Sequence, residues 1–136
     1  MVKYDHFLAP DFISEFANLV LYYDTHKSSF NPSFFEECEA FRNLVGMGVG
    51  ILPYVHQAVT NHEIGISLIS GWSGLIQKIV GETDYDIPSE IKNKANLMCV
   101  HVKDWLEQRG TVLDETLDAK TFREDLQGKY DLVKPI

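Results

Sequence analysis

Apolar residues recur every three to four positions along most of the chain, which is the spacing of helices that bury one face against a core. Polar and charged residues occupy the positions between them. This periodicity predicts a chain made of helices with almost no strand. The expected helices cover 12–25, Pro32 to about Val45, about 50–60, Ile66 to Gly81 and about 88–109, followed by a frayed or short sixth helix.

Residue types that favour helix ends support several of these boundaries. Asp11 is placed to accept hydrogen bonds from the free amides at the start of the first helix. Asn31 and Pro32 have the order of a capping residue followed by a proline in the first turn. Thr121 and Glu124 have capping-box spacing near the start of the sixth helix.

Two further features concern packing and the chain end. Gly71 and Gly74 lie inside the fourth predicted helix, where each costs roughly 1 kcal/mol relative to alanine. We expect these glycines to permit close helix packing. The last nine residues, 128–136, lack helical periodicity and are predicted to form a free tail or an extended strand against a neighbour.

The length of 136 residues, with 45% hydrophobic and 24% charged residues, suits one domain with a substantial core. The predicted fold is all-α, a single domain of about five to six stacked antiparallel helices. Within it we expect a helical domain over 1–110. Residues 111–136 are expected to add a short helix and a C-terminal tail, packed on that domain or extending from it.

Charge and cysteine content narrow the choice of partners. The net charge of −8 disfavours direct nucleic-acid binding, which relies on clustered Lys and Arg. Asp5 and His6 interrupt any signal-peptide pattern, and no apolar run is long enough to span a membrane. Cys38 and Cys99 lack the spacing of zinc ligands. We expect free thiols, a cytoplasmic location and no membrane contact.

Candidate catalytic residues are few. His56, His62 and Glu63 are the nearest approach to a metal-ligand group, yet adjacent residues of a helix point in different directions. His101 and Asp104, three residues apart on one predicted helix, could share a proton or simply form a pair. Nucleotide-binding and hydrolase motifs are missing from the sequence. We therefore expect no catalytic site, no metal and no cofactor.

The central stretch from Asn31 to Trp105 contains NPSFFEECEAFRNLVGMGVGILPYV, GWSGLIQKIVG and DIPSEIKNKANLMCVHVKDWL. In this order it resembles small bacterial and phage-type helical proteins of the HEAT-like kind, over just over half of the chain. The resemblance implies stacked antiparallel helices and, by analogy, a binding role. The matching positions are structural ones: Pro32, Phe34, Gly48, Leu52, Pro53, Trp72, Ile79, Gly81, Pro88, Trp105 and Leu106.

Three functions are compatible with these observations. The first is a non-enzymatic interaction module that holds a protein partner on a helix-stack surface. The second is an acidic inhibitor, or an immunity or antitoxin-type protein, that covers a basic surface of its target. The third is a small hydrolase using His56, His62, Glu63 or His101.

The predicted partner-binding residues lie around the end of the first helix, and the oligomeric state is left open. Tyr22, Tyr23 and Asp24 end that helix, and Phe30 follows in a polar linker. They combine aromatic anchors with an acid, as binding hot spots often do. The alternative is that Tyr23 and Phe30 cover the end of the bundle. Trp72 and Trp105 lie in apolar stripes and are expected in the core.

Substituting Tyr22 and Asp24 together is expected to weaken recovery of a cellular partner in a pull-down, because the pair would remove an anchor and a charge from the interface. The helical circular dichroism spectrum is expected to remain intact. A loss of stability, with no partner recovered by the unsubstituted protein, would mean that these residues pack the bundle end instead.

Overall fold

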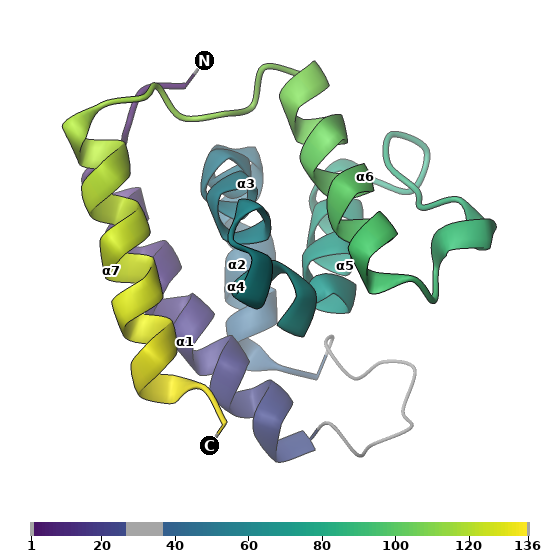
Figure 1. Ribbon diagram of the computed structural model, residues 1–136, viewed down its shortest axis with the longest axis horizontal. Coiled ribbons are helices and arrows are strands. Elements are labelled where there is room, and N and C mark those ends of the chain that lie inside the picture. Colours follow the sequence, from purple (N-terminus) through teal and green to yellow (C-terminus); the bar gives the residue numbers. More distant parts are fainter. Residues whose placement is uncertain (1, 27–36, 136) are drawn as a thin grey trace.

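Two long helices, α1 (Leu8–His26) and α7 (Leu117–Val133), form one side of the molecule, and shorter helices fill the rest (Figure 1). The computed structural model describes residues 2–26 and 37–135. Between the long helices the chain forms α2 (Glu39–Met47), the 3-10 turn η1 (Gly48–Ile51), α3 (Leu52–Thr60), α4 (His62–Ser67), α5 (Ile69–Val80), the 3-10 turn η2 (Ser89–Ile91) and α6 (Ala95–Gln108).

Helix α3 lies at the centre of the molecule, with the other helices around it (Figure 1). Every residue from Leu52 to Val59 is buried, so this helix has no solvent-facing side. It contacts α4, α5, α6 and α7. Pro53 is tolerated because it lies in the first turn, where an amide would have no helical partner. The all-α prediction is confirmed, and the fold is organised around one enclosed helix.

Aromatic side chains join α1 to three other helices. Phe12 and Phe16 stack on the indole of Trp72 in α5, with ring centroids 6.2 and 5.9 Å apart. Phe12 also lies 5.9 Å from Tyr54 of α3 and 6.1 Å from Phe122 of α7. Aromatic pairs in this distance range stabilise a core beyond simple area burial. This aromatic cluster therefore links the outer helices to the centre.

Helices α1 and α7 run side by side in the same direction. Val2 forms a parallel bridge with Leu113, just before α7. Farther along, the Nε2 atom of His6 lies 3.5 Å from a carboxylate oxygen of Asp118. Both helices start from this point and remain in contact. Their N-termini therefore share one end of the molecule, and their C-termini share the other.

The start of α1 differs from the sequence prediction. The Asp5 carboxylate accepts hydrogen bonds from the amides of Phe7 and Leu8, at 2.8 and 2.9 Å. Asp5 therefore caps the helix, which begins at Leu8 and includes Asp11 in its first turn. The predicted start at residue 12 was wrong because Pro10 is accommodated in the first turn of a helix that begins earlier.

Three internal boundaries also differ. The predicted start of the second helix at Pro32 lies outside the described residues, but Cys38 is extended and buried, so α2 begins only at Glu39. A break at Leu68 separates α4 from α5 where a single helix starting at Ile66 was predicted. The predicted helix over 88–109 is a 3-10 turn followed by the shorter α6.

The C-terminal segment shows the largest difference. Residues 128–133 are helical, so the predicted free tail or strand is wrong for most of its length. Thr116, rather than Thr121, caps α7 by accepting a hydrogen bond from the amide of Ala119 at 3.3 Å. The weak apolar pattern nevertheless buries one complete helical stripe. Its buried residues are Ala119, Phe122, Leu126 and Tyr130.

The structure bears on the packing predicted for the two tryptophans and for the glycines of the fourth predicted helix. Trp72 is fully buried, and its indole N–H donates to the backbone oxygen of Ile64 at 3.3 Å. Trp105 is only partly buried, and the guanidinium of Arg109 lies over one face of its ring, 4.0 Å from the centroid. A Cβ on Gly74 would meet nothing within 4 Å, so this glycine does not serve close packing.

A close approach does require Gly65 in α4. A Cβ at this position would lie 2.7 Å from the carbonyl oxygen of Val59, a backbone atom that cannot rotate away. Gly65→Ala is therefore expected to lower the free energy of unfolding by on the order of 1–3 kcal/mol, despite the better helix propensity of alanine. Urea denaturation measures the change. Gly74→Ala, in open space, is the matched control and is expected to gain up to about 1 kcal/mol. If Gly65→Ala and Gly74→Ala both raised the free energy of unfolding, the close approach at Gly65 would be contradicted.

Candidate functional site

Tyr54, His56 and Gln57 are polar side chains on the enclosed helix α3, and each points to a different neighbour. The Tyr54 hydroxyl accepts a hydrogen bond from the backbone amide of Asp5 at 2.8 Å. His56 reaches α6 and Gln57 reaches α7. Buried polar groups need partners, because their hydration is lost on folding. These contacts therefore position the N-terminal segment, α6 and α7 around α3.

His56 joins α3 to an ion pair on α6. Its Nε2 atom lies 3.3 Å from an oxygen of Glu107, and the same carboxylate lies 3.1 Å from the Lys103 ammonium. Burial lowers the pKa of His56 below its ordinary value, although the hydrogen bond to Glu107 opposes this shift. The hydrogen bond from Lys103 lowers the pKa of Glu107, and the contact with His56 adds to it. The group therefore favours a neutral imidazole beside a charged carboxylate.

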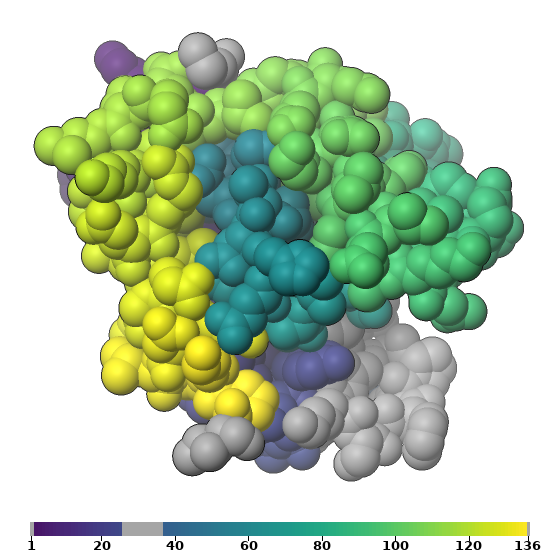
Figure 2. All heavy atoms as spheres, viewed as in Figure 1, coloured from purple at the N-terminus to yellow at the C-terminus, as the bar shows by residue number. Residues whose placement is uncertain are grey.

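Gln57 makes the corresponding contact with α7. Its side-chain oxygen accepts a hydrogen bond from Arg123 at 3.3 Å, and Arg123 also pairs with Glu115 at 2.6 Å. A hollow of about 160 Å³ opens beside these groups, lined also by Thr60. The space-filling view shows α3 recessed between α7 and α6 (Figure 2).

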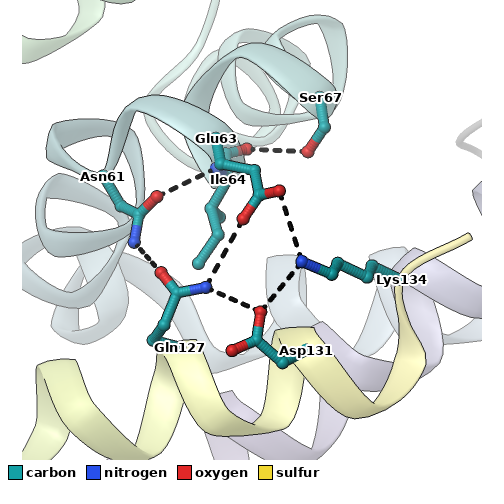
Figure 3. Close-up of polar contacts among 7 residues, drawn as sticks. All are labelled: Asn61, Glu63, Ile64, Ser67, Gln127, Asp131 and Lys134. Atoms are coloured by element: carbon teal, nitrogen blue, oxygen red, sulfur yellow. Dashed lines mark hydrogen bonds and ion pairs between the residues drawn. The ribbon is translucent and has the colours of Figure 1, made fainter.

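A second polar group ties α4 to the end of α7 (Figure 3). Asn61 accepts a hydrogen bond from the amide of Ile64 and donates to Gln127. Gln127 also donates to Asp131 at 2.9 Å, and Lys134 lies 3.1 Å from the same Asp131 oxygen. The hydrogen bond from Gln127, and then that from Lys134, lowers the pKa of Asp131. The network fixes the last turns of α7, where the sequence predicted a tail.

The candidate catalytic residues are dispersed. Glu63 turns toward α7, where it lies 3.5 Å from Lys134, whereas His62 lines a separate hollow next to α6. His101 faces the Tyr85 hydroxyl at 3.4 Å rather than Asp104. Within 2–26 and 37–135, no three His, Cys, Asp or Glu side chains are grouped closely enough to hold a metal ion.

The geometry of His56 suits packing better than proton transfer. A histidine held by a carboxylate through one ring nitrogen must offer the other nitrogen to a substrate. Here Nε2 faces Glu107, and Nδ1 is buried with no hydrogen-bond partner in the described part of the chain. A substrate could reach Nδ1 only if α3 or its neighbours moved.

The predicted partner-binding corner is only partly within the described residues. Tyr22, Tyr23 and Asp24 lie in the last turns of α1 and are partly buried, whereas Phe30 is outside the described ranges. Tyr22 lines a polar hollow between α1 and α2, and Tyr23 packs against the core. Both tyrosines therefore pack against the core, and Tyr22 also lines a surface hollow.

The outer side of the α1–α7 pair forms a groove, which we call the α1–α7 groove. It encloses about 460 Å³ and has more apolar than polar surface. Tyr4 contacts the aromatic cluster through Phe122, with centroids 6.3 Å apart, so this wall of the groove continues the core. The residues that line it are Tyr4, Pro10, Ile13, Ser14, Glu124, Asp125, Gly128, Lys129 and Leu132.

Large apolar side chains stand exposed at both ends of these helices. Phe7 is 89% exposed and Leu117 is 78% exposed at the shared N-terminal end, and Leu132 is 81% exposed near the C-terminal end. Single exposed apolar residues are ordinary, but several along one helix pair next to an apolar groove mark a contact surface. Leu132 lines the groove itself, and Phe7 and Leu117 lie at the N-terminal ends of the helices that form it.

Gly128 is a second unusual feature of the groove. It lies inside α7, where glycine costs roughly 1 kcal/mol relative to alanine. A Cβ there would meet nothing within 4 Å, so packing within this chain does not require glycine. The missing side chain deepens the groove between α1 and α7.

The sequence prediction missed this groove. Leu132 falls within the predicted tail over 128–136, although it lies on α7. The available signal was the spacing of Ala119, Phe122, Leu126 and Tyr130, which continues the helix and leaves Leu132 on its outer face. The pairing of α1 with α7 had no signal in the sequence, because it joins the two ends of the described chain.

The chain matches no protein-family model, no curated protein and no solved structure. None of the helices in the described ranges has the length and apolar character needed to cross a membrane.

Stability is expected to depend on pH through His56. Because the pKa of His56 in the folded state lies below its ordinary 6.5, the unfolded chain binds more protons as the pH falls past that value. The free energy of unfolding should therefore decrease between about pH 7.5 and about pH 5.5. His56→Gln should flatten this decrease in urea denaturation, and His62→Gln, at an exposed position, is the histidine-removal control. An unchanged profile in His56→Gln would contradict the assignment.

Proposed function

We propose that this protein is a non-enzymatic protein-binding module that holds its partner on the outer side of α1 and α7. The observation that carries the proposal is the α1–α7 groove together with the exposed Phe7, Leu117 and Leu132 along the same helix pair. Apolar side chains this exposed are stabilised when a partner removes them from water. Stacked helices bind partners along their surfaces, so the HEAT-like arrangement expected from the sequence would fit the same role.

The charge favours one kind of partner. With a net charge of −8, the protein attracts basic surfaces and repels nucleic-acid backbones. This supports the second candidate, an acidic inhibitor or immunity or antitoxin-type protein that covers a basic surface of its target. Such capture weakens steeply with ionic strength, whereas apolar docking does not. Binding that is abolished at high salt favours the second candidate, whereas binding that is only weakened favours docking through apolar contacts in the groove.

Other observations bear on the hydrolase hypothesis, on the expected cellular location and on the predicted partner-binding corner. The hydrolase hypothesis has little support, because Nδ1 of His56 is buried and Glu63 is engaged by Lys134. Cys38 and Cys99 are free thiols, which supports a reducing compartment such as the cytoplasm. We keep the corner around Tyr22 and Asp24 as a second candidate contact surface, since Tyr22 lines a surface hollow.

Site-specific photo-crosslinking in the native host tests the proposal. A photoreactive residue at position 128, which faces open space in the groove, is expected to form a covalent adduct with a partner protein. The adduct should be lost when Leu132→Glu is added, because a charge at the exposed end of the groove disfavours apolar docking. The matched control places the photoreactive residue at position 97, where Leu97 is exposed on α6.

Adduct formation at 128 but not at 97, with loss in the Leu132→Glu background, supports binding in the groove. No adduct at 128, or equal adducts at both positions, would overturn the proposal. Circular dichroism of each variant checks that the helices are retained.

A further inference from the structure

We propose that the α1–α7 groove binds a basic amphipathic α-helix of about four turns from a partner protein, running antiparallel to α1 and α7. This inference rests on the proposed protein-binding function and assigns the chemistry of the bound segment. Four features support it: the helical backbone of both walls, the spacing of the exposed apolar side chains, the charge of the lining residues, and the direction of α1 and α7.

The backbone of the groove favours a helix over an extended peptide. An extended peptide obtains its affinity from main-chain hydrogen bonds to an exposed strand edge. Both walls of this groove are helices, whose amide and carbonyl groups bond within the helix. A bound segment must therefore satisfy its own backbone, as a helix does. Ser14 and Gly128 keep the space between the walls open, so a third helix can approach closely.

The spacing of the exposed apolar side chains sets the length of the bound helix. Leu117 and Leu132 are 15 residues apart on α7, which corresponds to about 22 Å at about 1.5 Å per residue. A helix of about four turns spans the same distance. Its apolar stripe would cover Phe7 and Leu117 at one end and Leu132 at the other. A shorter segment would leave one end of this surface exposed to water.

Charge complementarity favours a basic segment. Two carboxylates, Glu124 and Asp125, line the groove against one ammonium, Lys129. The whole chain carries a net charge of −8, so a second copy brings the same negative charge to the interface. Lys and Arg beside the apolar stripe of the partner helix would instead meet Glu124 and Asp125.

The parallel arrangement of α1 and α7 sets the direction in which the bound helix runs. Leu132 lies in the last turn of α7, so the negative end of that helix dipole is near it, and α1 runs in the same direction as α7 (Figure 1). The positive N-terminal end of a bound helix is favoured at that end. The partner helix therefore runs opposite to α1 and α7.

Three synthetic peptides of about 16 residues test the assignment, with fluorescence anisotropy on the full chain. The first has a leucine stripe at helical spacing and lysine elsewhere, the second has the same composition in scrambled order, and the third has glutamate in place of lysine. We expect the first to bind at least about tenfold more tightly than the others, with an affinity that falls as salt rises. Equal binding of the scrambled or the acidic peptide would overturn the proposal.

Variants of the groove locate the binding. Leu132→Glu and Gly128→Phe are expected to weaken binding of the first peptide at least about tenfold, the latter by filling the groove from a position with no neighbour within 4 Å. Leu97→Glu, on the exposed surface of α6, is the control and should leave binding unchanged. Unchanged binding in both groove variants would overturn the assignment, and circular dichroism confirms that each variant is folded.

Two further measurements test the direction of the bound helix and whether a second copy of this chain occupies the groove instead. A benzophenone on the peptide N-terminus should crosslink near Leu132, and crosslinking near Leu117 would overturn the antiparallel direction. A dimer in light scattering that Leu132→Glu converts to monomer would overturn the partner helix in favour of a second copy. If position 128 forms an adduct in the host but no peptide binds, the helix assignment fails while the proposed function stands. Without an adduct at 128, the proposed function itself fails.

Discussion

The enclosure of α3 is the constraint on which the rest of the structure depends. A helix buried on all sides needs neighbours in every direction, and it needs partners for each polar group that it takes out of water. Apolar contacts supply the first requirement. Tyr54, His56 and Gln57 meet most of the second by reaching Asp5, α6 and α7, and within the described residues Nδ1 of His56 is the exception. Apolar packing is tolerant of small rotations, whereas these hydrogen bonds require particular partners. The polar side chains therefore help to specify which element lies on which side of α3.

The α1–α7 groove is a consequence of this arrangement. Both helices use their inner stripes to cover the aromatic cluster, with Phe12 and Phe16 from α1 and Phe122 from α7. Two convex helices side by side leave a channel between their outer faces. In an ordinary surface channel, polar side chains would fill that space. Here Gly128 leaves it open and Leu132 stands exposed at its end. The two sides of the same helix pair thus serve stability and recognition separately.

Much of the helical content could be predicted from the sequence, because periodicity reports which residues share a buried face. The third helix and the burial of Trp72 followed from that pattern. Boundaries were less accessible, since Asp5 and Thr116 act as caps only when the chain adopts the right turn before each helix. The groove was not predictable at all. Its walls come from opposite ends of the described chain, and sequence periodicity carries no information about which helices become neighbours.

The bridge between Val2 and Leu113 has a further consequence for the order in which the molecule is completed. It brings together residues separated by most of the chain, so the loop-closure entropy is lost before the contact gains anything. Helices near one another in sequence, such as α3 and α4, can assemble first, and α7 joins α1 late. By the same reasoning, α7 can detach as a unit without opening the interior contacts of α3 with α5 and α6. A ligand bound between α1 and α7 would then keep the two helices together. It would slow hydrogen exchange in α7 far more than in the central helix.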